Sequence, residues 1–250
     1  MRNIFLAVTV ACAPIVSAAA PAPQVDLALV LAVDVSGSMD AREQHIQRDG
    51  YVRAFRSPQV VAAITGGLIG RIAVSYVEWS SQGQQYVVVP WTLIDSTGTS
   101  AAFADTLTAA PLHNGTSTSI SSALLFSSAL LDKSEYAAIR RAIDVSGDGP
   151  NSDGGPVTDA RDAVLARGIT INGLPIFLPG ESDAPDIDQY YANCVIGGAN
   201  AFLFTVNDLS QLPEAIRQKL VQEIATAPLS SPLFQRASGG TYVCDETIVE

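Results

Sequence analysis

One stretch of the sequence constrains the fold more than any other: the run DLALVLAVD at residues 26–34. It is apolar almost without interruption, and it ends in an aspartate. A strand with one face in water alternates between apolar and polar residues, whereas a continuous apolar run is typical of a strand that is buried on both faces. Such strands occur mainly in parallel sheets that helices cover on both sides. The run therefore predicts a central strand of an α/β protein.

The rest of the chain continues this pattern, because apolar runs alternate with segments of helical composition. Only a short segment containing Gly83 separates the second and third apolar runs, which predicts a hairpin. Pro90 cannot donate a hydrogen bond within a sheet, so the third strand is expected at an edge. The predicted fold is a Rossmann-like three-layer α/β sandwich, with a mainly parallel central sheet, one antiparallel edge strand and helices on both faces. We expect strands at residues 26–34, 71–79, 85–91, 141–146, 169–177 and 201–206, and helices at 39–55, 58–64, 101–107, 119–131, 157–167, 186–193 and 209–225.

The composition fits a large folded domain and narrows the range of functions. The chain has 250 residues, enough to bury a core, and apolar residues make up 48% of it against 16% charged. Asp and Glu number 25 against 14 Lys and Arg, which gives a formal net charge of −11. Such a chain repels phosphate backbones, so we expect no nucleic-acid partner. Its two histidines, His45 and His113, are too few for a three-histidine zinc site.

Residues 1–19 have the layout of a cleavable secretory signal peptide. Arg2 supplies a positive charge, residues 4–10 are apolar, and small residues close the segment. Pro14 interrupts the apolar stretch, which is shorter than the roughly 20 residues that a membrane span needs. No other run of the sequence is apolar and long enough to cross a bilayer. We therefore expect a periplasmic or secreted protein without a membrane span.

The cysteines leave two alternatives open. Cleavage of the signal peptide would remove Cys12 and leave Cys194 and Cys244. An even number of cysteines in an oxidising compartment is compatible with a disulfide. Two separate thiols are the alternative, because the sequence does not fix the distance between the two residues.

Three polar loops in the sequence are rich in side-chain oxygen. The first, at residues 34–38, directly follows the first strand; the second, GTSTS at 115–119, leads into a predicted helix; the third, GDG at 147–149, follows the fourth strand. In open α/β sheets, ligand sites gather at the carboxyl ends of the strands. None of these loops contains Cys or His, and oxygen ligands suit a hard cation such as Mg²⁺, Mn²⁺ or Ca²⁺.

The spacing D-x-S-x-S in the first loop has a physical meaning. Alternate residues of an extended segment point to the same side, so Asp34, Ser36 and Ser38 can face one ion. Gly37 allows the chain to turn between the two serines. Helix N-capping would account for one of these side chains but not for three. Few carboxylates and neutral hydroxyls leave a divalent ion under-neutralised, so it attracts an acidic group from outside.

The segment VLAVDVSGSM, followed by a helix, resembles the metal-ion-dependent adhesion site (MIDAS) of von Willebrand factor type A (VWA) domains. The family pattern continues with a threonine that lies five residues before a small residue and six before an apolar one. Thr118 satisfies this spacing, and Thr116 is the alternative. The pattern closes with a strand that ends in Asp-Gly, here Asp148-Gly149. The chain departs from the commoner Thr-Asp-Gly in this loop, which reads VSGDGPN.

The resemblance spans about residues 26–225, and the chain looks most like a bacterial secreted branch of the superfamily that carries no assigned function. It implies a VWA-like domain at residues 25–227, with a C-terminal extension at 228–250 packed on the same domain. It also implies that a carboxylate of a partner protein completes the coordination of the ion, and that the helix predicted at 209–225 shifts when a ligand binds. The implied ion is Mg²⁺, with Mn²⁺ or Ca²⁺ as alternatives, and its implied ligands are Asp34, Ser36, Ser38, Thr118 and Asp148.

Two other functions are alternatives to a binding module. A Mg²⁺-dependent phosphatase or hydrolase would also use an Asp after the first strand. It would have a second Asp where this chain has Ser36, and a Lys near the later loops, and the chain has neither. The G-x-S-x-G motif of serine hydrolases is absent as well, so we expect a protein that is not an enzyme. A structural envelope protein with a vestigial site is the second alternative.

Three residues near the loops are expected to have ordinary roles. Trp79, at the end of the second strand, is expected to be buried, and Glu78 beside it to face solvent. His113 is expected to be a solvated loop residue, with pH sensing as the alternative.

Overall fold

The computed structural model of the protein describes residues 21–177, 186–225, 234–236 and 243–244. The predicted signal peptide and most of the predicted C-terminal extension lie outside these residues. Among the helices within them, none is long and apolar enough to cross a bilayer.

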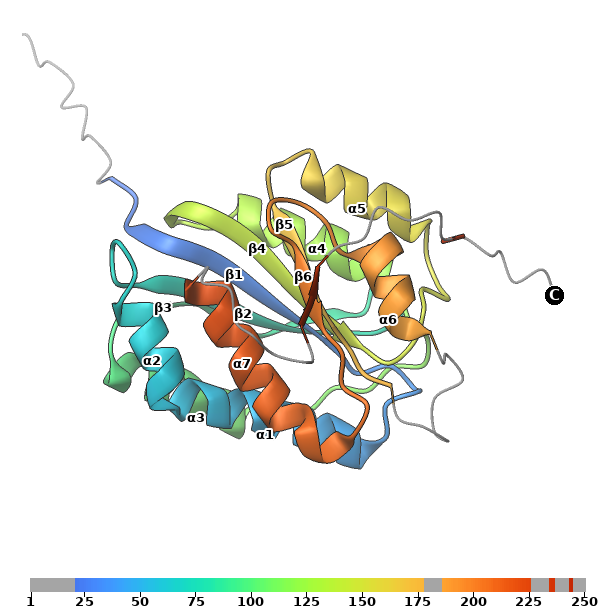
Figure 1. The fold of residues 1–250 in the computed structure, drawn as a ribbon, viewed down its shortest axis with the longest axis horizontal. Helices are drawn as coiled ribbons and strands as arrows, with labels where there is room; N and C mark the ends of the chain where they lie inside the picture. The colour runs from blue at the N-terminus through green and yellow to red at the C-terminus, as the bar shows by residue number, and fades with distance from the viewer. Residues whose placement is uncertain (1–20, 178–185, 226–233, 237–242, 245–250) are drawn as a thin grey trace, which may run out of the picture.

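A seven-stranded sheet runs through the centre of the molecule in the order β3-β2-β1-β4-β5-β6-β7 (Figure 1). The strands β2, β1, β4, β5 and β6 are parallel neighbours, whereas β3 and β7 pair antiparallel at the two edges. The mainly parallel sheet, the β2–β3 hairpin and the edge position of the strand with Pro90 are therefore confirmed. The strands are β1 (Gln24–Asp34), β2 (Ile72–Trp79), β3 (Gln85–Ile94), β4 (Ala137–Gly147), β5 (Thr170–Pro175), β6 (Phe202–Phe204) and β7 (Phe234–Arg236).

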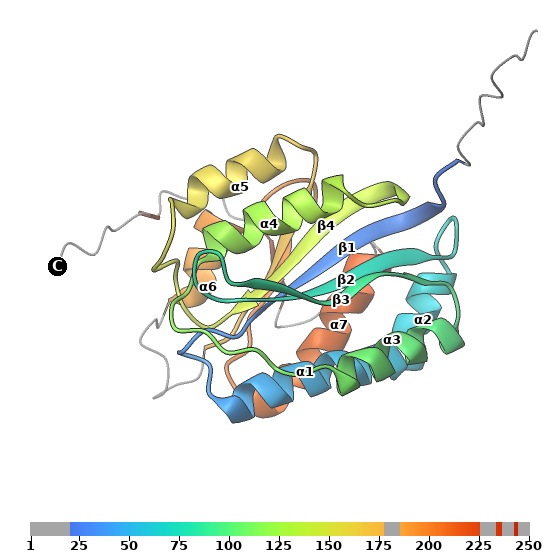
Figure 2. The same ribbon diagram turned by 180° about the vertical axis from the view of Figure 1, so that it is seen from behind.

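Helices cover both faces of the sheet and complete the predicted three-layer sandwich. Helices α1, α2, α3 and α7 lie on one face, and α4, α5 and α6 lie on the other, as Figures 1 and 2 show from opposite sides. The α-helices are α1 (Ala41–Arg56), α2 (Pro58–Thr65), α3 (Thr97–Ala109), α4 (Ile120–Asp132), α5 (Val157–Leu165), α6 (Ile187–Tyr190) and α7 (Leu212–Ala225). A π-helical turn, η1 (Tyr191–Val195), continues α6, and a 3₁₀ turn, η2 (Leu209–Gln211), precedes α7.

Local capping explains where one helix differs from its predicted bounds. Helix α3 begins at Thr97, four residues before the predicted start at 101, because Ser96 is its N-cap. The Ser96 side chain accepts a hydrogen bond from Thr99 N, and the Thr99 side chain accepts one from Ser96 N. This reciprocal capping box satisfies two backbone donors that a helix end otherwise leaves unpaired.

The strand that ends in Asp34 is buried on both faces, as predicted. Alternate residues such as Leu29 and Leu31 pack into the apolar cluster beneath α1 and α7, while Val30 and Ala32 pack into the cluster beneath α4 and α5. Burying one such aliphatic side chain contributes about 1.5–3 kcal/mol. Packing on both sides therefore fixes the position and direction of β1 between the two helical layers, and with them the point at which Asp34 leaves the sheet.

Cys194 and Cys244 form a disulfide, with their Cα atoms 5.4 Å apart. This settles the alternative that the sequence left open. Cys194 lies in η1 and is fully buried, so the bond holds a residue near the C-terminus against the α5–α6 side of the core.

We expect the Cys244→Ser variant to lose about 2–4 kcal/mol of unfolding free energy, because the cross-link restricts the unfolded chain. Urea denaturation of the oxidised protein measures this loss. Cys194→Ser should lose a similar amount, and the double variant should lose little more than either single one. A variant as stable as the parent would contradict a stabilising role for the bond.

Candidate metal centre

Asp34 stands at the carboxyl end of β1, where the chain leaves the centre of the sheet. Its side chain is fully buried, and its Oδ1 accepts a hydrogen bond of 2.7 Å from the backbone N–H of Ser36. The backbone N–H of Val35 donates to the carbonyl of Trp79 in β2 at 2.9 Å, which keeps this loop against the neighbouring strand. The packing of β1 and β2 therefore also fixes the carboxylate.

The two serines of the first loop serve the site and not the following helix. Asp40 is the N-cap of α1, and it forms a capping box with Glu43. Ser36 Oγ lies 3.0 Å from Ser38 Oγ, and Ser38 Oγ donates to Asp148 Oδ1 at 2.6 Å. The structure thus joins the first and third loops through hydroxyl groups, and helix capping does not explain either serine.

Thr118 belongs to the second loop, which packs against the third. Its carbonyl accepts hydrogen bonds from Ser152 N at 2.8 Å and Asp153 N at 3.1 Å, and the residue is buried. A Cβ placed on Gly149 would lie 3.9 Å from Thr118 Oγ1. The Thr118 hydroxyl is therefore close to the backbone that directly follows Asp148.

Thr116, the alternative to Thr118, lies at the rim. It is exposed, and its Oγ1 is 3.3 Å from Ser81 Oγ. Its carbonyl oxygen would be 3.1 Å from a Cβ on Gly37, so its backbone closes over the first loop. This geometry favours Thr118 over Thr116 as a side-chain donor within the site.

Gly147 allows Asp34 to approach the end of β4. A Cβ at this position would lie 2.7 Å from Asp34 Oδ2 and 2.8 Å from Tyr191 Oη, closer than real Cβ atoms come. A larger residue at position 147 would therefore displace Asp34 or Tyr191. Sequence reasoning did not place Tyr191 at the site, because an aromatic residue in a helix normally packs in the core.

A fully buried acid, Asp34, meets a half-buried one, Asp148. Burial raises the pKa of Asp34 to about 8; the negative charge of Asp148 adds to this rise, and hydrogen bonds from Ser36 and from the backbone of Asp148 partly oppose it. Burial also raises the pKa of Asp148, against the effect of the Ser38 hydrogen bond. A buried carboxylate beside another acid is costly unless it is protonated or a cation is close to it.

The side chains present fit a divalent cation that oxygen atoms hold. Asp34 Oδ2 is buried and has no hydrogen-bond partner among the described residues, so its lone pairs are free for an ion. A serine hydroxyl that donates its proton also keeps lone pairs for an ion. Within the described part of the chain, no group of three or more His, Cys, Asp or Glu side chains could hold a metal. An ion at this place would therefore depend on hydroxyls as well as on two carboxylates.

A buried ion pair anchors the segment that leads into the second loop, and sequence reasoning missed it. Glu78 is fully buried, so the expectation that it faces solvent is wrong. It forms a salt bridge with Arg48 of α1, and Arg48 also donates to the carbonyls of Ala110 at 2.6 Å and Pro111 at 3.1 Å. These contacts between β2, α1 and the loop are long-range, so no local pattern could predict them.

His113 takes part in the same cluster and is not simply a solvated loop residue. Its backbone N–H donates to Glu78 Oε2 at 3.0 Å, and its Nδ1 lies 2.8 Å from the same oxygen. Its ring stacks on that of Tyr86, with centroids 4.0 Å apart. The start of the loop that leads to Thr118 is thereby anchored to β2 and β3.

Residues 24–228 of the chain match a family model whose description is "Protein of unknown function (DUF1194)". No curated protein matches the chain. The family match covers all strands of the sheet except β7, and all three loops of the candidate site.

Several solved structures share the fold at low sequence identity. Proximal thread matrix protein 1 from the mussel byssus, in a structure with a zinc-occupied MIDAS motif, is 17% identical, with a TM-score of 0.53, over 82% of this chain and 49% of that one. A von Willebrand factor type A structure from Catenulispora acidiphila is 15% identical, with a TM-score of 0.55, over 88% and 56%. The pilus adhesin SpaC from Lactobacillus rhamnosus GG, in its open conformation, is 15% identical, with a TM-score of 0.58, over 82% and 31%.

The chain spans about half the length of the mussel and Catenulispora proteins and about a third of SpaC. Identities this low establish the fold alone. The prediction of a VWA-like α/β sandwich is thereby confirmed, and the ion and the partner are not decided by the similarity.

We expect Asp34→Asn to stabilise the metal-free protein at high pH. The pKa of Asp34 is about 8 in the folded state, against an ordinary value of 3.8. Between these values the folded state keeps a proton that the unfolded state has lost, so the free energy of unfolding falls as the pH rises from about 4 to about 8. The asparagine has no charge to bury and keeps an oxygen for Ser36 N.

Urea denaturation with EDTA present measures the difference. At pH 8 the variant should be more stable than the parent, by on the order of a few kcal/mol, and the difference should shrink toward pH 4. A difference that does not change with pH would contradict a raised pKa at Asp34.

We expect Gly147→Ala to cost about 1–3 kcal/mol of unfolding free energy, because its methyl group would displace Asp34 or Tyr191. Gly155→Ala, in the same loop, is the matched control: a Cβ there would have nothing within 4 Å. It should change stability by less than about 0.5 kcal/mol. Equal effects of the two substitutions in thermal or urea unfolding would contradict the steric role of Gly147.

Proposed function

This chain belongs to the DUF1194 family and has a VWA-like fold, and we propose that it is a binding module that holds a divalent cation and, through it, an acidic group of a partner protein. The observation that carries the proposal is the buried carboxylate of Asp34, with Oδ2 unpaired among the described residues and Asp148 as its charged neighbour. A cation offsets the cost of burying the Asp34 carboxylate beside a second acid. The proposed ligands are Asp34, Ser36, Ser38, Thr118 and Asp148.

The proposed ligands come from all three loops. Asp34 is held by β1 and by Ser36 N, and Asp148 is oriented by the hydrogen bond from Ser38. The serine hydroxyls would direct lone pairs to the ion, while the hydroxyl of Ser38 still donates its hydrogen bond to Asp148. Thr118 approaches from the second loop, and Arg48 holds the segment that leads into this loop through the carbonyls of Ala110 and Pro111. A bound divalent ion would supply positive charge and open coordination positions.

The exposed side of the site is suited to a partner. Asp34 and Ser36 are buried, whereas Gly37, Ser38 and Thr116 are exposed. A carboxylate of a partner protein can therefore approach from the side of the second serine and complete the coordination of the ion. Hydroxyl and carboxylate oxygen favours a hard cation, and we propose Mg²⁺, with Mn²⁺ or Ca²⁺ as alternatives.

We further propose that the protein works in the periplasm or is secreted. The predicted signal peptide at residues 1–19 supports this, although it lies outside the described residues. The Cys194–Cys244 disulfide supports it independently, because such bonds persist mainly in oxidising compartments.

The site favours binding over catalysis. Ser36 stands where a phosphatase of the aspartyl type would have its second acid. His113 is bound to Glu78, and His45 is exposed on α1 with its ring on the carbonyl of Ala41, so neither is placed as a general base within the site. Hydrolysis of a generic phosphate ester that required Asp34 would support the enzyme alternative instead.

Calorimetric titration of the EDTA-treated protein with Mg²⁺, Mn²⁺ and Ca²⁺ tests the proposal. We expect saturable binding that Asp34→Ala abolishes, because the variant loses the buried carboxylate. Thr118→Ala should weaken binding, and Thr116→Ala, the matched control at the rim, should leave it unchanged. Absence of binding, or binding that Asp34→Ala does not alter, would contradict the proposed site.

Beads that carry carboxyl groups test the second half of the proposal. Retention of the protein should need the divalent ion and the free carboxyl groups, and beads that carry amides should not retain it. Equal retention on both kinds of bead, or retention in EDTA, would contradict recognition of an acid through the ion. A protein that ignores all three ions would fit a vestigial site in a structural protein.

A further inference from the structure

Three charged side chains meet in the core on the α7 face of the sheet, away from the proposed metal site. Lys219 and Glu223 lie on α7, and Asp144 lies on β4. Lys219 Nζ forms an ion pair with Asp144 Oδ1 and lies 3.2 Å from Glu223 Oε2. The side chains of all three are 1% exposed. The proposed function uses none of them.

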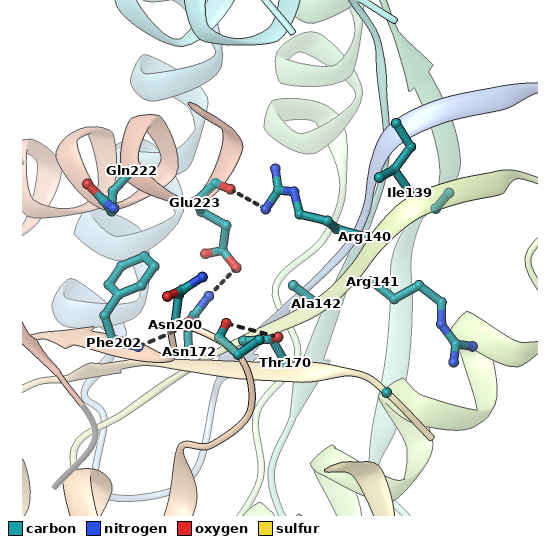
Figure 3. Close-up of a pocket in the computed structure, with 13 residues that line it drawn as sticks. Ile139, Arg140, Arg141, Ala142, Thr170, Asn172, Asn200, Phe202, Gln222 and Glu223 are labelled. Atoms are coloured by element: carbon teal, nitrogen blue, oxygen red, sulfur yellow. Dashed lines mark hydrogen bonds between the residues drawn. The ribbon is translucent and has the colours of Figure 1, made fainter. Parts of the chain in front are cut away.

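Glu223 is fixed between two partners. Asn172 Nδ2 donates to Glu223 Oε1 at 2.8 Å, and Figure 3 shows this amide directed to the carboxylate. The Asn172 side chain is itself held, because its oxygen accepts a hydrogen bond of 3.0 Å from Phe202 N. One oxygen of Glu223 is thus occupied by Asn172, and the other faces the lysine.

The surroundings of the lysine are buried and include an aromatic ring. The ring of Phe202 lies 5.3 Å from Lys219 Nζ, and α7 packs on α1 and α2 around the cluster. The chain has only two lysines: Lys133, which is exposed, and Lys219. Ion pairs removed from water are costly, and replacing them by neutral groups is often stabilising. A reaction that removes the charges of this cluster would therefore be favoured.

We propose that Lys219 and Asp144 condense to an amide, so that an intramolecular isopeptide bond joins α7 to β4, with Glu223 as the proton carrier. Lys219 Nζ already contacts the Asp144 carboxyl, so the reaction needs no diffusion, and fixed proximity of this kind strongly accelerates bond formation. The step needs no oxidant, cofactor or second substrate.

The atoms and charges of the step balance within the cluster. Burial raises the pKa of the Asp144 carboxyl, with Lys219 opposing this rise and Glu223 adding to it, so the neutral acid is accessible. A proton passes from the Lys219 ammonium to the Glu223 carboxylate. The free amine attacks Asp144 Cγ, the Nζ–Cγ bond forms, and the Cγ–O bond breaks as the hydroxyl leaves with a proton from Nζ. One water is released, and Glu223 ends as the neutral acid.

The intact mass of the purified chain tests the proposal. The protein is made with its own N-terminal segment and folded in an oxidising compartment, its N-terminus is determined, and its mass is measured after reduction of the disulfide. We expect a mass below the calculated one by the mass of one water molecule. Peptide mapping should find the peptides that contain Asp144 and Lys219 joined, and trypsin should not cleave after Lys219.

Matched variants identify the groups. Lys219→Arg keeps the positive charge but cannot form the bond, so it should have the full calculated mass. Lys133→Arg, the change at the exposed lysine, should keep the deficit. Glu223→Gln should have the full mass, because it lacks the proton carrier; a complete deficit in this variant would overturn the role of Glu223.

Other outcomes overturn the assignment. A parent protein of full mass would exclude the bond. A deficit that mild alkaline incubation reverses would indicate a succinimide at an Asp-Gly pair such as Asp148-Gly149. A cross-link from Lys219 to Glu223 would exclude Asp144 as the acyl group. None of these results depends on metal binding, so this experiment tests the amide bond independently of the proposed function.

Discussion

The carboxyl group of Asp34 lies in the core, at the end of the strand on which the sheet is built, and its strongest charged neighbour is another carboxylate. The surrounding loops are arranged around this group. Ser36 N binds one of its oxygens, Gly147 lets the other reach the end of β4, and Ser38 links the neighbouring Asp148 to the same place. Ionisation of the buried Asp34 carboxyl therefore lowers the stability of the metal-free fold, and the same buried carboxylate raises the affinity for a cation.

Three other buried acids of the chain differ from Asp34 because each has a basic side chain in contact with it. Glu78 is as deeply buried as Asp34, but Arg48 and His113 contact it directly. Asp144 and Glu223 are buried as well, and Lys219 lies between them. In both clusters the chain supplies its own cation. After burial, the strongest influence on the pKa of Asp34 is another acid, Asp148, and not a cation. This contrast with the other two clusters is the physical argument for an ion from solution.

The sequence predicted what depends on local pattern and missed what depends on contacts between distant elements. The apolar run before Asp34, and the three oxygen-rich loops at strand ends, are visible in one dimension because a parallel sheet gathers those ends at one edge. The partners of Glu78 come from another helix and another loop, and Tyr191 reaches the site from η1. The three-residue strand β7 carries too little pattern to be predicted. The amphipathic pattern of the helix predicted at 209–225 gave no sign that the charged side chain of Lys219 points into the core.

The cluster at Lys219 also bears on whether α7 can move. The resemblance to VWA domains implies a helix that shifts on ligand binding, and α7 occupies that place. Asp144 and Ser146 lie on the face of β4 that α7 covers, and Asp148 follows two residues beyond Ser146. A covalent bond between Lys219 and Asp144 and a sliding α7 exclude each other. If the bond forms, helix and strand act as one body, and the oxygen donors at the end of β4 are held ready for the ion before any partner arrives.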